Sequence, residues 1–120
     1  MTLLPDDALV VRGGQNLREN FAKGSGVKIV SGGKVENVSV NCAPHRTVEE
    51  LTASNPATGY PGIPNRQIGV TTVGRIRAAG GDVVVSPTRT NPYHATLGGL
   101  TPEEASKLFR PTTPNPHRTP

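Results

Sequence analysis

The chain has 120 residues, of which 33% are hydrophobic and 18% charged, and it carries 13 Lys and Arg against 9 Asp and Glu, a formal net charge of +4. Its apolar content lies below the ~45–50% that is typical of globular domains when Gly is counted, and no stretch approaches the ~18 consecutive apolar residues of a membrane span. These values argue against a membrane protein and predict one small soluble domain, whose positive charge favours a nucleic acid or an acidic protein partner.

The single cysteine, Cys42, cannot form an intramolecular disulfide, which fits a reducing compartment. The amino end has neither a basic region nor a long apolar run, so it does not resemble a signal peptide. We therefore expect a cytoplasmic protein in which Cys42 is a small buried residue of a strand.

The first elements in chain order are a strand and a short helix. Residues 8–12 form an apolar run that ends at Gly13-Gly14, which predicts a strand whose last residue is Arg12. Asn16 occupies the expected N-cap of a two-turn helix, and Gly24 occupies its expected carboxyl stop.

A hairpin and a second helix follow. The Val-rich runs 27–30 and 35–40 flank Ser31-Gly32-Gly33, a turn that provides glycines for positive φ. Residues 47–53 open with a Thr-x-x-Glu capping box and predict a short helix. The next segment, 54–66, contains three Pro and two Gly and predicts an ordered loop that lies over the core.

Residues 68–79 carry two patterns. The first few alternate as a strand does, whereas later apolar residues recur at helical spacing. The length and the Gly80-Gly81 stop favour a helix that begins near Thr71 or Thr72, with Arg75 and Arg77 directed away from its buried stripe.

The carboxyl third predicts two strands, a helix and a tail. The strands are 82–86 and 93–97, and the helix 101–109 has Thr at its N-cap, Pro at N1 and Glu at N3. The tail, 110–120, has four Pro and no periodicity, so disorder is expected. The element order predicts a single α+β domain over 1–109, with a mainly antiparallel twisted sheet and three to four short helices.

His94 and Thr96 are the main candidates for chemistry, since side chains two apart on a strand share one face. RNA cleavage by the adjacent 2′-hydroxyl needs a base, an acid and positive charge on the phosphate, but no metal. His94 would be the acid or base and Thr96 a phosphate donor, while Arg89 supplies charge with Arg12 or Lys23. The competing interpretation makes His94 a half-buried strand residue and Arg89 a solvated loop charge.

Two further arginines, Arg75 and Arg77, extend the expected substrate-binding charge. No metal or cofactor site is expected, because the three histidines are scattered and no nucleotide-binding glycine motif occurs. His45, His94 and His117 each begin a His-x-Thr triplet, which resembles the paired motif of two-histidine phosphoesterases. Only the second triplet lies in an expected strand.

The layout from Leu9 to Phe109 resembles small bacterial toxin ribonucleases of the barnase, EndoU and colicin type. The matching positions are His94, Thr96 and Arg89. The resemblance implies a metal-independent ribonuclease with an RNA target and an antitoxin or immunity partner. One alternative is a noncatalytic protein-binding module that forms half of a bacterial pair. Another is an ADP-ribosyltransferase, because Arg12-Gly13 resembles that family's first-strand arginine and Val38-Ser39-Val40 its later serine strand, although the terminal Glu-x-Glu is missing.

Overall fold

A computed structural model describes residues 3–23 and 27–118, and within them the chain forms an α+β domain, as expected. The elements in chain order are β1 (Leu9–Gly13), α1 (Arg18–Ala22), β2 (Lys28–Val30), the 3-10 turn η1 (Ser31–Gly33), β3 (Lys34–Glu36), β4 (Val38–Cys42), α2 (Val48–Thr52), β5 (Gln67–Thr72), α3 (Val73–Ala78), β6 (Asp82–Val85), β7 (His94–Gly98), α4 (Pro102–Phe109) and β8 (Thr113–Pro114). None of the helices in these two ranges is long and apolar enough to cross a membrane.

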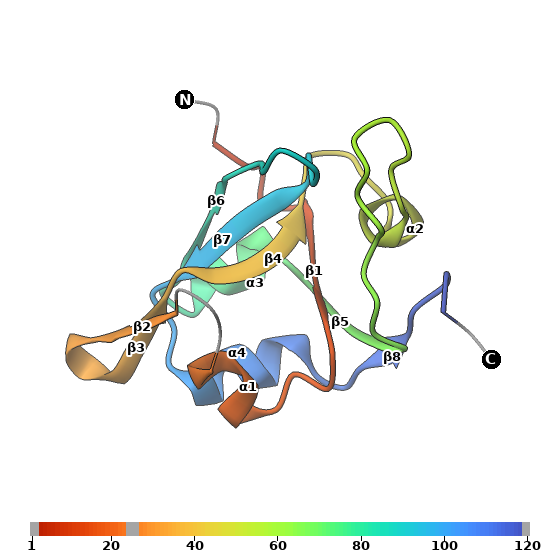
Figure 1. The fold of residues 1–120 in the computed structure, drawn as a ribbon. Helices are drawn as coiled ribbons and strands as arrows, with labels where there is room; N and C mark the ends of the chain where they lie inside the picture. Colours follow the sequence, from red (N-terminus) through yellow and green to blue (C-terminus); the bar gives the residue numbers. More distant parts are fainter. Residues whose placement is uncertain (1–2, 24–26, 119–120) are drawn as a thin grey trace.

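Six strands form one sheet in the order β6-β7-β4-β1-β5-β8, and β2 and β3 form a separate hairpin. Each neighbouring pair in both sheets is antiparallel. Figure 1 shows the hairpin at one end of the molecule and α2, with the loop that follows it, at the other. The prediction of an antiparallel sheet with three to four short helices is confirmed.

The two faces of the sheet have different covers. Val10 and its neighbours on β4 and β7 pack with Phe21 of α1, Ile76 of α3 and Phe109 of α4, so three helices cover the first face. Val11 points to the second face and packs with residues of α2, β5 and the loop 54–66. The residues that cover this second face do not extend over β6, where the side chains of Val84 and Val85 remain exposed.

Local signals predicted several elements correctly. The hairpin forms around residues 31–33, although Asn37, with φ of 62°, ends it and directs the chain into β4 of the main sheet. The capping boxes of α2 and α4 form with Thr47 and Thr101 as N-caps. Both patterns in 68–79 are real, because Thr72 ends β5 and also caps α3.

Two predictions at the ends of the chain are wrong. Asn16 is not an N-cap: it has φ of 55°, its amide donates to the carbonyls of Arg12 and Gly14, and α1 begins only after Leu17. The expected helix stop at Gly24 lies outside the described residues. The tail is ordered as far as residue 118, because β8 pairs with β5 and Asn115 is fully buried.

Candidate functional site

His94 begins β7 and has a fixed ring orientation. Its Nδ1 lies 2.9 Å from the carbonyl oxygen of Ser86, and its Nε2 lies 3.1 Å from the hydroxyl of Ser39. Because a carbonyl only accepts hydrogen bonds, the neutral ring carries its proton on Nδ1. Nε2 is then a basic lone pair that accepts the hydrogen of Ser39.

The strands place these groups by their alternation. Ala95 and Leu97 point into the helix-covered core, so His94 and Thr96 lie on the opposite face of β7. On β4, Ser39 is the Cα partner of Thr96 and is exposed between two buried valines. The Ser86 hydroxyl completes a polar chain, since it lies 3.0 Å from Nδ1 of His94 and 2.8 Å from the Thr96 hydroxyl.

Ser39 and His94 line a cavity of about 220 Å³ whose other polar walls are three asparagine amides, the phenol of Tyr60 and Arg12. The buried Asn41 donates from Nδ2 to the oxygen of Tyr60 at 3.1 Å and accepts at Oδ1 from Asn91 at 2.9 Å. The Tyr60 oxygen therefore accepts one hydrogen bond while its own hydrogen remains available. Such a phenol can donate a proton to a bound group.

A cationic cavity of about 370 Å³ adjoins the first and shares Arg12, Gly13 and Asn65 with it. Lys23 also lines it. The Arg12 guanidinium stands 4.4 Å from the ring centre of Phe21 and donates to Asn16 Oδ1 at 2.9 Å. Burial lowers the pKa of Arg12, but a guanidinium remains charged in a protein.

The other predicted cations lie elsewhere. Arg77 is paired with Asp6 at 2.7 Å and Asp82 at 3.1 Å. These carboxylates raise the pKa of Arg77, and the largest cause is the hydrogen bond that Arg77 donates to Asp6. Arg75 is exposed on the same helix, α3, which packs on the sheet face opposite to His94. Arg89 is exposed in the loop before β7 and makes no hydrogen bond or ion pair with any other described residue.

The structure therefore joins His94 and Thr96 through Ser86 and places Arg12 and Lys23 in the adjoining cavity. Neither Arg75 nor Arg77 lines either cavity. The remaining histidines line neither cavity: His45 is exposed, and His117 lies 2.8 Å from the carbonyl of Glu49.

Sequence reasoning missed Tyr60, Asn41 and Asn91 as members of the site, and it mentioned Ser39 only within the transferase alternative. Ser39 had a usable signal, because it is the polar member of a Val-Ser-Val alternation. Tyr60 had none beyond its place in a Pro- and Gly-rich loop, since its distance from His94 in sequence conceals their shared cavity.

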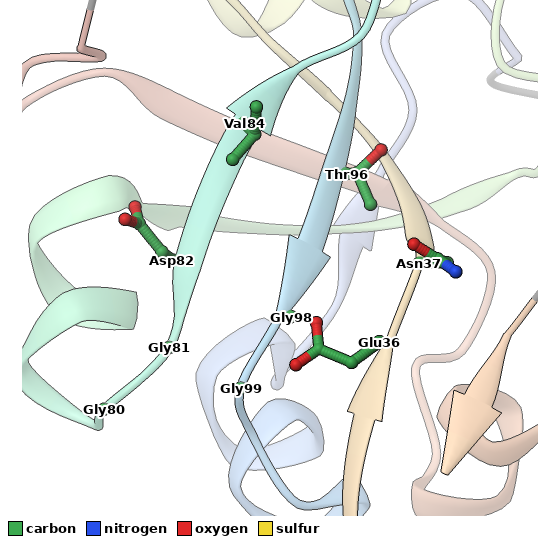
Figure 2. A pocket seen from close by; sticks show the side chains of 9 residues that line it. All are labelled: Glu36, Asn37, Gly80, Gly81, Asp82, Val84, Thr96, Gly98 and Gly99. Atoms are coloured by element: carbon green, nitrogen blue, oxygen red, sulfur yellow. The ribbon is translucent and has the colours of Figure 1, made fainter. Parts of the chain in front are cut away.

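A larger hollow of about 660 Å³ lies at the other end of the same sheet face (Figure 2). Its polar side chains are those of Glu36, Asn37, Asp82 and Thr96. The Glu36 carboxylate lies directly against Gly98, where a Cβ would overlap it. Its walls contain no histidine, cysteine or serine. We place the candidate site at the smaller cavity, because a basic nitrogen meets a hydroxyl there and not in the larger hollow.

No set of three or more His, Cys, Asp or Glu side chains in residues 3–23 and 27–118 is arranged to hold a metal ion. No family model, curated protein or solved structure matches the chain.

Proposed function

We propose that the chain is a metal-independent ribonuclease of the bacterial toxin type, with His94 as its general base. The observation that carries the proposal is the fixed orientation of His94, whose Nδ1 is held by the Ser86 carbonyl while Nε2 faces a hydroxyl in a cavity. A ring held in one tautomer with a hydroxyl at hydrogen-bond distance is the arrangement that general base catalysis requires.

The ribose 2′-hydroxyl takes the place of the Ser39 hydroxyl at Nε2 of His94. His94 removes its proton as the 2′-oxygen attacks the adjacent phosphorus, and a 2′,3′-cyclic phosphate forms while the bond to the 5′-oxygen breaks. Tyr60 donates its phenolic proton to the leaving 5′-oxygen. Arg12 and Lys23, in the adjoining cavity, hold a neighbouring phosphate.

The test is cleavage of a short single-stranded RNA by purified protein in excess chelator. We expect cleavage by the wild type, a 10²- to 10⁴-fold slower rate for His94→Ala, which is roughly the usual contribution of a general base, and no cleavage where a single 2′-deoxyribose replaces the target ribose. His45→Ala is the matched control, because this histidine is exposed and outside the cavity. Undiminished cleavage by His94→Ala would overturn the proposal.

Binding charge is tested separately from chemistry. Lys23→Ala should weaken RNA binding by an amount that shrinks as salt rises, because one phosphate contact is lost. Arg75→Ala is the control, since this exposed arginine lines neither cavity. Expression of the wild type in bacteria should arrest growth, and co-expression of a neutralising partner protein should restore it.

The transferase alternative has one observation in its favour, because Arg12 and Ser39 stand on hydrogen-bonded neighbouring strands and line the same cavity. It predicts consumption of NAD⁺ by the purified protein, with the RNA left intact. Protein that leaves both RNA and NAD⁺ unchanged and binds a second protein stably would instead support the noncatalytic module.

A further inference from the structure

Ser39 is more than a stand-in for a substrate hydroxyl, because its surroundings match those of an activated nucleophile. We propose that Ser39 is a nucleophile activated by His94, and that the chain hydrolyses small acyl esters through an acyl-Ser39 intermediate. This inference uses the proposed role of His94 as a base but does not depend on RNA being a substrate.

The Ser39 hydroxyl, the His94 ring and the Ser86 carbonyl are linked in a row by hydrogen bonds. Ser39 Oγ donates to Nε2 of His94 at 3.1 Å, and Nδ1 of His94 donates to the Ser86 carbonyl at 2.9 Å. Nucleophile, base and orienting acceptor are the three parts that activate a serine, and here a main-chain carbonyl orients the base in place of a carboxylate. The Ser86 carbonyl is fixed in turn, since the Ser86 amide donates to the His94 carbonyl at 3.0 Å.

Ser39 is also accessible and rigidly held. It is exposed, while its neighbours Val38 and Val40 are buried in the core with 0% and 3% relative exposure. A central strand of a sheet positions a reactive group more reproducibly than a loop does. The hydroxyl can therefore meet an ester without any movement of the main chain.

The same cavity offers donors to the oxyanion. Tyr60, whose oxygen already accepts from Asn41, has its own hydrogen available, and the side chain of Asn65 makes no hydrogen bond with any other described residue. Both line the cavity beside Ser39 and His94. A volume of about 220 Å³ favours a short acyl group.

The reaction balances without a cofactor. Ser39 Oγ bonds to the carbonyl carbon and its proton moves to Nε2 of His94, while the carbonyl oxygen becomes an anion. When the carbonyl reforms, the ester C–O bond breaks and the leaving alkoxide takes the proton from Nε2. Water then attacks the acyl-Ser39 ester with His94 again as base, which releases the carboxylic acid and restores Ser39.

The test uses two probes on folded protein, p-nitrophenyl acetate as substrate and a fluorophosphonate as a covalent label mapped by mass spectrometry. We expect one label per chain, at Ser39, and ester hydrolysis that falls at least about 10²-fold in both Ser39→Ala and His94→Ala. Ser31→Ala is the matched control, because Ser31 is an exposed serine in the turn between β2 and β3. Thermal unfolding of each variant establishes that it is folded.

Labelling of Ser31 and Ser39 to the same extent, or ester hydrolysis that persists in Ser39→Ala, would refute the role of Ser39 as the nucleophile. RNA cleavage measured on the same preparations separates the two proposals. Cleavage of RNA without labelling of Ser39 would refute the esterase proposal alone. Labelling of Ser39 without RNA cleavage would refute the ribonuclease proposal and support the esterase.

Discussion

Replacement of Asn115 by alanine should loosen the wall of the candidate cavity and lower the free energy of unfolding by about 3 kcal/mol. The Asn115 side chain is fully buried and makes three hydrogen bonds: Nδ2 donates to the carbonyls of Ile63 and Asn65, both at 2.9 Å, and Oδ1 accepts from the amide of His117 at 3.0 Å. Each such bond contributes about 1 kcal/mol, and a buried carbonyl left unpaired costs at least as much.

Urea denaturation measures the change as a lower midpoint at an unchanged slope. The control is Thr112→Ala, which removes one exposed hydrogen bond to the side chain of Gln67 from the same tail and should cost less than about 1 kcal/mol. RNA cleavage should fall in Asn115→Ala at temperatures where the protein remains folded, because Ile63 and Asn65 line the cavity. Equal stabilities of the two variants would refute this account of the tail.

Three other predictions test the core, the thiol and a helix cap. Gly69→Ala should lower the free energy of unfolding by about 3 kcal/mol, since its methyl group would overlap the main-chain oxygen of Phe109. Gly98→Ala is the control: its methyl group meets only the end of the flexible Glu36 side chain and should cost under about 1 kcal/mol. Equal urea midpoints for the two variants would contradict this. Burial raises the pKa of the Cys42 thiol to about 11 from 9.0, so iodoacetamide at pH 8 should modify unfolded protein much faster than native protein. The free energy of unfolding should fall as pH rises from 9.0 to about 11, because the thiol loses its proton in the unfolded chain before it does so in the native one. Thr101→Ala should cost about 1 kcal/mol in thermal unfolding through loss of the N-cap of α4, and Thr101→Ser should restore most of it.

Elements governed by neighbouring residues were predictable. The capping boxes at Thr47 and Thr101 and the glycine turn at 31–33 act within a few residues, and all three formed as expected. Asn16 failed because its side chain forms hydrogen bonds with the residues just before it, and these compete with its capping preference. Its side chain accepts from the Arg12 guanidinium at 2.9 Å, and this contact accompanies the positive φ that is incompatible with an N-cap.

The prediction for the tail failed because its contacts are with residues far away in the sequence. Its composition predicts disorder, yet Asn115 and Arg118 donate hydrogen bonds to carbonyls of an earlier loop. Asn115 lies 52 positions after its partner Ile63, and Arg118 lies 57 positions after its partner Pro61. No local pattern encodes such contacts. The same limit applies to the site, since strand alternation placed His94 and Thr96 together but could not reveal that Tyr60 shares a cavity with His94.

The parts of the cavity are synthesised at widely separated times. Arg12 and Ser39 are made early, His94 late, and the residues that hold the loop 61–66 in place, Asn115 and Arg118, last. The wall of the cavity is therefore complete only when residues 115–118 have been made and have packed against this loop.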